Sequence, residues 1–186
     1  DFRENYFGKI VDNNSLILFL NHTELKYSQD INLIPKKLDL FTEVKIFMHL
    51  IRQYFKFKKM LSRLPKKNNE FNLILLSSFI SNASMLNIRY YTYIKSILLD
   101  KKLKDIYLTF EGHAYERSII KAANECNHKT FAYQHGSVSN LNVGIYYKLN
   151  PILMPDFILM SGFITYQYFI EKKFKPENLI VVGSNR

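Results

Sequence analysis

The sequence predicts an α/β fold, and two observations support this. Short apolar runs at 106–110, 130–134, 157–160 and 179–182 alternate with helical stretches at 114–126 and 163–173, a pattern that is typical of parallel strands joined by crossover helices. Before residue 105 the apolar positions mostly recur three or four residues apart, which is the helical period. We therefore expect a Rossmann-like parallel sheet with covering helices in 105–186 and a helical segment in the first half.

The first part of the chain, 1–104, contains one predicted strand followed by helices. The short apolar run SLILFL at 15–20 is typical of a buried strand. A long helix is predicted over about 40–64, and Pro65 ends it. The apolar and aromatic stretch 72–99 predicts one or two further helices. The long helix has an apolar stripe that we expect in the core: Phe47, Leu50, Ile51, Tyr54, Phe57, Leu61 and Leu64.

The same helix carries most of the positive charge of the chain. Between Lys36 and Lys67, ten Lys or Arg stand against Asp39 and Glu43, a local balance of +8 in a chain of net charge +10. Such a basic face is either simply solvated or in contact with an anionic partner. We expect peripheral contact with an anionic membrane through the 45–67 basic helix. Its basic stripe consists of Arg52, Lys56, Lys59, Arg63 and Lys66.

Length and composition favour one globular domain over 1–186. The chain has 186 residues, 47% of them hydrophobic, which is enough for a sizeable core and excludes wholesale disorder. Cys126 is the single cysteine, so an internal disulfide and a cysteine zinc cluster are excluded, which fits a cytoplasmic location. No apolar run reaches the length of about 18 residues that a spanning helix needs.

Several common catalytic motifs are absent from the sequence. It contains no G-x-G-x-x-G or Walker loop, no H-E-x-x-H and no G-x-S-x-G. Dehydrogenase, nucleoside triphosphatase, zinc protease and serine hydrolase functions are therefore disfavoured. No acid-rich cluster suggests a metal site, so neither a metal nor a cofactor is predicted.

Glycine and polar residues follow each predicted strand of the second half. The carboxyl ends of parallel strands meet at one edge of a sheet, where ligands bind in open α/β folds. Glycine permits close backbone approach, and the helix N-termini at this edge offer N–H groups to anions. We therefore expect a binding rim formed by Glu111-Gly112-His113, His135-Gly136-Ser137, Ser161-Gly162 and Gly183-Ser184.

The join after the first of these strands has two interpretations. Glu111 and His113 are expected at the rim, with Glu116 and Arg117 in the first turn of the next helix. In the first interpretation these side chains bind substrate. In the second, Glu116 serves the helix N-terminus electrostatically and His113 caps it. His135 is expected to project from a strand end, as a general base, a phosphate contact or a purely structural histidine.

The order of four segments resembles a known enzyme group. TFEGHAYERSIIKAANE, FAYQHGSVS, LMPDFILMSG and NLIVVGSNR, together about 105–186, resemble the bacterial surface-carbohydrate glycosyltransferases of GT-B architecture. The segments look closest to capsule and lipopolysaccharide enzymes with a strand-end E-G-H-x-x-E-R and a downstream Q-H-G. Ala114-Tyr115 departs from the commoner Pro-Trp of that group, although Tyr115 keeps an aromatic ring there.

The resemblance implies two Rossmann-like domains that face a cleft. This chain would be mostly the N-terminal one, half of a GT-B fold, with the C-terminal nucleotide-sugar domain missing and the fragment inactive alone. It implies transfer of a sugar from a nucleotide-sugar to a glycan or lipid-linked acceptor. Glu111 would be the catalytic carboxylate, His135 the second polar participant, and Arg117 would orient Glu111 or pair with an anion. The implied substrate contacts are His113, Glu116, Arg117, Gly136, Ser137, Ser161, Gly162, Gly183, Ser184 and Arg186.

Other functions remain open at the level of sequence. A sugar-nucleotide epimerase or a polyol-phosphate transferase of the same architecture would also combine strand-end histidines with phosphate binding. A noncatalytic scaffold or anion-binding module is a further alternative. Nucleic-acid binding is disfavoured, because the charge is concentrated on one predicted helix and no nucleic-acid motif accompanies it.

Overall fold

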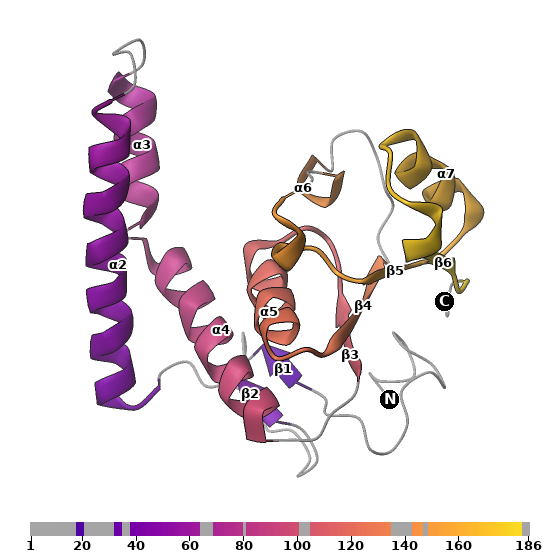
Figure 1. Cartoon of the computed structure of the whole chain (residues 1–186), viewed down its shortest axis with the longest axis horizontal. Helices are drawn as coiled ribbons and strands as arrows, with labels where there is room; N and C mark the ends of the chain where they lie inside the picture. Colours follow the sequence, from indigo (N-terminus) through magenta and orange to yellow (C-terminus); the bar gives the residue numbers. More distant parts are fainter. Residues whose placement is uncertain are drawn as a thin grey trace.

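The computed structural model describes residues 18–20, 32–34, 38–63, 69–79, 81–100, 105–134, 143–146 and 149–183. Within these ranges the chain is α/β, as predicted (Figure 1). Two short strands, β1 (Leu18–Leu20) and β2 (Asn32–Ile34), pair in parallel with each other in a sheet of their own. The first lies inside the predicted strand 15–20, whereas the second was not predicted.

The main sheet has four parallel strands, as the alternating pattern predicts. They are β3 (Asp105–Thr109), β4 (Lys129–Gln134), β5 (Phe157–Met160) and β6 (Leu179–Val181), and they pair in the order of the chain. All three connections therefore step in the same direction across the sheet. Since such crossovers are right-handed, the connecting segments lie on the same face of the sheet.

The connecting segments differ in length. Helix α5 (Ala114–Glu125) joins β3 to β4, and α7 (Phe163–Glu171) followed by the 3-10 helix η3 (Pro176–Asn178) joins β5 to β6. The described residues between β4 and β5 include the short helix α6 (Val143–Tyr146) and the 3-10 turn η2 (Pro151–Leu153). These two short elements lie between the predicted strands 130–134 and 157–160, where the sequence predicted no helix.

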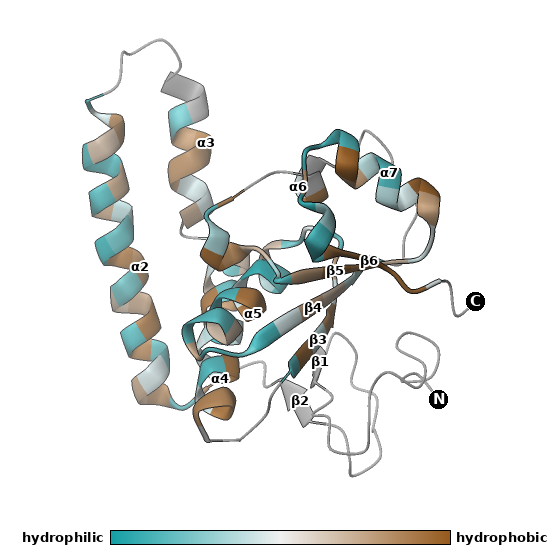
Figure 2. Cartoon of the chain, turned by 45° about the vertical axis from the view of Figure 1, so that its right-hand side comes forward, coloured by the Kyte–Doolittle hydropathy of each residue, from teal (hydrophilic) through white to brown (hydrophobic). Residues whose placement is uncertain are grey.

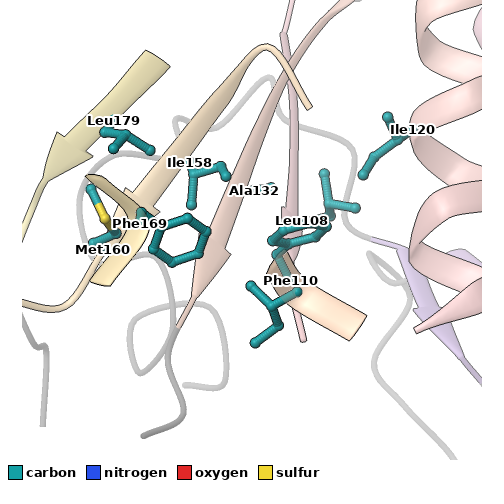
Figure 3. Packing of buried hydrophobic residues seen from close by; sticks show 9 residues of the cluster. Leu108, Phe110, Ile120, Ala132, Ile158, Met160, Phe169 and Leu179 are labelled. Atoms are coloured by element: carbon teal, nitrogen blue, oxygen red, sulfur yellow. The ribbon is translucent and has the colours of Figure 1, made fainter. Parts of the chain in front are cut away.

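The core lies between the sheet and these connecting segments (Figure 3). Alternate residues of the strands face it, because successive side chains of a strand point to opposite sides. From the other side come Ile120 of α5, Ile145 of α6 and Phe169 of α7, which are all fully buried. The strand residues of this core are Leu108, Ala132, Ile158, Met160 and Leu179, with Phe110 just after β3.

The opposite face of the sheet carries an aromatic row. Tyr107, Phe131 and Phe157 stand in register on three neighbouring strands. The rings stack with centroids 5.0 Å apart in both pairs. Cross-strand aromatic pairs of this kind stabilise one register over its neighbours.

The described residues of the first half form three helices, α2 (Leu40–Leu61), α3 (Asn69–Phe79) and α4 (Asn82–Asp100). Helices α2 and α3 stand side by side away from the main sheet (Figure 1), and the rings of Phe57 and Phe79 meet at 4.6 Å between them. Helix α4 packs against α5 through Tyr90, Ile94 and Leu98. The predicted helix at 40–64 and the two helices within 72–99 are thus confirmed.

Helix α2 is held at one end and exposed along most of its length. The Asp39 carboxylate caps it by accepting a hydrogen bond from the Thr42 N–H at 3.0 Å. Glu43 joins α2 to α4, because its two carboxylate oxygens accept from Nε of Arg89 at 2.7 and 2.9 Å. Ile46 and Leu61 are the buried residues of this helix.

The expectation that Phe47 lies in the core is wrong. Its side chain is 51% exposed, because α2 meets the rest of the described chain along a narrow side that faces α3 and α4. Leu64 and Lys66, the last members of the two predicted stripes, lie outside the described residues. Figure 2 shows hydrophobic and hydrophilic residues interleaved along α2, and several of the hydrophobic side chains of this helix are exposed.

Candidate functional site

The turn after β3 is shaped by a close approach of two backbones. Gly112 has a φ of +82°, in the left-handed region that favours glycine. A Cβ at this position would lie 2.4 Å from the carbonyl carbon of Gly144 and 2.6 Å from the backbone nitrogen of Ile145. The turn therefore needs glycine for both conformation and space, and it fixes α6 against the carboxyl end of β3.

Glu116 uses its carboxylate to hold this turn. The side chain is only 1% exposed. Its oxygens accept from the backbone N–H of Glu111 at 3.0 and 2.9 Å and from that of His113 at 2.8 Å. Burial raises the pKa of Glu116 above its usual value, and the N–H groups of His113 and Glu111 oppose that rise. The alternative interpretation, in which Glu116 serves the helix N-terminus, thus has direct support.

Glu111 and His113 lie at the predicted strand end. The hydrogen bonds to Glu116 fix the backbone of both residues, and His113 is the N-cap residue of α5 with an exposed side chain. The imidazole stacks on the Tyr115 ring with centroids 5.3 Å apart. Burial, assisted by the charges of Glu116 and Glu111, raises the pKa of Tyr115 to about 12. This tyrosine therefore stays neutral and supports the imidazole through its ring.

Arg117 is a buried cation without a carboxylate partner in the described part of the chain. It is 6% exposed, and it donates to the carbonyl oxygens of Gly144 at 2.9 Å and Leu153 at 3.2 Å. The guanidinium also lies 4.7 Å from the centre of the Phe110 ring. Burial lowers its pKa from the ordinary value. These contacts tie α5 to α6 and η2, and none of these hydrogen bonds goes to Glu111.

The other strand ends reach the same edge of the sheet as Glu111, because the strands are parallel. Ser161 and Gly162 follow β5, and Gly162 is the N-cap residue of α7. Gly183 follows β6, and its carbonyl accepts from the Tyr133 hydroxyl at 3.3 Å. The structure thus brings together three of the four predicted strand ends. The remaining candidates lie outside the described residues: His135, Gly136, Ser137, Ser184 and Arg186.

Beside this edge the structure has a cavity of about 960 Å³ between α2, α4 and α5, which the sequence did not predict. Of the predicted site residues, Arg117 lines it. The basic residues that sequence reasoning missed are Lys45 and His49 of α2 and Lys121 of α5. Lys45 and His49, and likewise Arg117 and Lys121, are four residues apart and so share a helix face. The sequence shows this spacing, but it does not show that the two helix faces lie opposite each other.

Metal binding and membrane insertion find no support in the described ranges. They contain no group of three or more His, Cys, Asp or Glu side chains suited to hold a metal ion. No helix in them has both the length and the apolar character needed to cross a membrane.

The chain matches no protein-family model, and comparisons with curated proteins and with solved structures likewise give no match.

Proposed function

We propose that this chain forms one half of a GT-B glycosyltransferase of bacterial surface polysaccharide biosynthesis, such as that of capsule or lipopolysaccharide. The observation that carries the proposal is the carboxyl edge of the parallel sheet. There Glu111 follows β3, with its backbone fixed by the buried Glu116. Ser161, Gly162 and Gly183 follow later strands at the same edge.

The proposed reaction transfers a sugar from a nucleotide-sugar to a hydroxyl of a glycan or a lipid-linked acceptor. The acceptor oxygen attacks the anomeric carbon, the bond from that carbon to the phosphate oxygen breaks, and the nucleotide leaves with the electron pair. Glu111 takes the proton of the acceptor hydroxyl as general base. His135 serves as the second base or contacts the leaving phosphate, and backbone N–H groups of Gly136 and Ser137 stabilise its charge.

The roles of Glu111 and His135 are tested by turnover of the full-length gene product. We expect Glu111→Gln and His135→Ala each to lower the rate of nucleotide release by about 10²- to 10⁴-fold, as for loss of a general base. Glu177→Gln is the matched control, because Glu177 is exposed and its carboxylate lies 3.8 Å from the exposed Lys175. Rates within a few-fold of the unsubstituted protein for both variants would refute these roles.

A noncatalytic anion-binding module is the second candidate, and the cationic cavity beside α5 favours it. A sugar-nucleotide epimerase or a polyol-phosphate transferase on the same architecture is the remaining alternative. Product analysis separates these candidates: an epimerase converts one sugar-nucleotide to another without releasing nucleotide, and a binding module converts none.

We also propose that the protein is cytoplasmic and rests on the inner face of an anionic membrane through α2. At about 100° per residue, six exposed apolar residues of this helix share one face beside a row of basic residues, and interfacial helices show this arrangement. The six are Leu40, Phe41, Val44, Phe47, Met48 and Phe55, whereas Met60, also exposed, lies on another side of the helix. The basic row consists of the described residues Lys45, Arg52, Lys56, Lys59 and Arg63.

Vesicle sedimentation tests the membrane proposal. The protein should sediment with vesicles that contain phosphatidylserine and much less with pure phosphatidylcholine, because each basic residue near an anionic surface contributes about 1 kcal/mol. The double variant Arg52→Glu, Lys56→Glu should lose this binding, and Lys175→Glu, an exposed lysine on another element, should keep it. Equal binding to both vesicle types would contradict the proposal.

A further inference from the structure

We propose that the cavity between α2, α4 and α5 is a binding site for an organic phosphate whose organic part is largely apolar. The cavity adjoins the predicted rim, because Gly112 and Arg117 belong to its lining, whereas Glu111 and His113 do not. The inference concerns ligand binding alone and is tested without turnover.

Basic side chains reach the cavity from two opposing helices. Lys45 and His49 come from α2, and Arg117 and Lys121 come from α5. No Asp or Glu belongs to the described lining, although Glu125, outside the lining, lies 3.8 Å from Nζ of Lys121. Basic groups that converge from two sides on a concave site concentrate an anion there.

Arg117 gives the strongest reason to expect an anion. No carboxylate of the described residues lies within 4 Å of its guanidinium, and its hydrogen bonds go to neutral acceptors on α6 and η2. The charge of the neighbouring Glu116 favours the guanidinium cation, but that carboxylate is already hydrogen-bonded to the N–H groups of Glu111 and His113. A buried charge without a directly paired counter-ion is costly. A phosphate in the adjoining cavity would offset that cost, and Lys121, one helical turn further along α5, would reach the same ligand.

The other residues that line the cavity indicate the chemistry of the rest of the ligand. Ile46, Ile88, Leu149 and Leu153 present apolar surface, and Tyr91 presents a ring. The volume of about 960 Å³ is at the upper end of the range for small-molecule sites. An inorganic phosphate would leave most of this space and all of the apolar wall without contacts, so an apolar group attached to the phosphate fits better.

Isothermal titration calorimetry of the purified protein tests the site without any turnover. The probes are inorganic phosphate, uridine monophosphate, geranyl phosphate and dihexanoyl phosphatidic acid. We expect geranyl phosphate to bind at least about tenfold more tightly than inorganic phosphate, because only its chain contacts the apolar wall. Binding of dihexanoyl phosphatidic acid in preference to geranyl phosphate would identify a lipid headgroup as the source of the same chemistry.

Matched lysine variants assign the binding to this cavity. Lys45→Ala and Lys121→Ala should each weaken geranyl phosphate about three- to tenfold, as for loss of a charge-assisted contact. Lys175→Ala is the control, because Lys175 is an exposed lysine that does not belong to the described lining of the cavity. Circular dichroism confirms that each variant is folded.

Three results would overturn the proposal. They are the absence of binding by all four probes at millimolar concentration, binding of uridine monophosphate in preference to both apolar phosphates, and equal affinity in the Lys45, Lys121 and Lys175 variants. Loss of transferase activity in the full-length protein is not among them, so the proposed function and this site fail independently.

Discussion

Gly112→Ala should destabilise the protein strongly, because the alanine would have two independent energetic costs, one from its backbone conformation and one from steric overlap of its Cβ. At a φ of +82° an alanine adopts a left-handed conformation, which costs about 1–2 kcal/mol. Its Cβ would also lie between 2.4 and 2.6 Å from three backbone atoms of Gly144 and Ile145. Backbone cannot rotate away as a side chain does, so relief requires α6 to shift, and overpacking of this kind costs about 1–3 kcal/mol. The free energy of unfolding should therefore fall by about 2–5 kcal/mol.

Urea denaturation followed by far-ultraviolet circular dichroism measures this change. The control is Gly162→Ala, since Gly162 has an extended φ of −173° and a Cβ there would meet no atom within 4 Å. That control should change the free energy of unfolding by less than about 0.5 kcal/mol. If Gly112→Ala and Gly162→Ala unfold at the same urea concentration with the same slope, the described packing of the β3 turn on α6 is incorrect.

Two further predictions concern buried and partly buried carboxylates. Glu116→Gln should lower the free energy of unfolding by about 1–3 kcal/mol, because the amide NH₂ would face one of the backbone N–H groups that the carboxylate now accepts from. Urea titration measures this, and an effect no larger than that of Glu177→Gln would contradict it. Hydrogen bonds from Lys95, the larger effect, and from Tyr91 lower the pKa of Glu125 below 4.5. These hydrogen bonds therefore stabilise the folded protein fully at a pH above the pKa that Glu125 has in the unfolded chain. The stabilisation is lost as the pH falls through the lower pKa of Glu125 in the folded protein. Melting temperatures from pH 7 to pH 3 should therefore fall more steeply for the unsubstituted protein than for Glu125→Gln, and parallel curves would exclude this contribution.

Local signals predicted most of the α/β part. Glycine and polar residues follow each of the four strands within a few residues. Such residues indicate the end of a strand from the local sequence alone, without knowledge of which strands pair. The helix at 40–64 was predicted from its period, and the structure adds that the Asp39 carboxylate caps it. Strand β2 was not predicted from such local signals, because it has three residues and it pairs with a distant segment, β1.

The sequence predicted only those parts of the candidate site whose residues are neighbours along the chain. Glu111, Gly112 and His113 could be placed at a strand end from sequence, but Glu116 required the backbone geometry that brings two N–H groups onto its carboxylate. The cavity depends on the arrangement of three helices. Periodicity gives the faces of α2 and α5 but not which faces oppose, and for that reason Phe47 was placed in the core while Lys45 and His49 were not placed in a site.

The central claim is that the carboxyl edge of the sheet serves sugar transfer, and one assay tests it most directly. The full-length gene product is incubated with a panel of nucleotide-sugars, including acidic sugars linked to cytidine monophosphate, and nucleotide release is followed by chromatography. We predict release of a single nucleotide, in the presence of an acceptor, that Glu111→Gln abolishes and Glu177→Gln does not. A folded protein that releases no nucleotide from any donor, or a Glu111→Gln variant that releases it at the unsubstituted rate, would contradict the account.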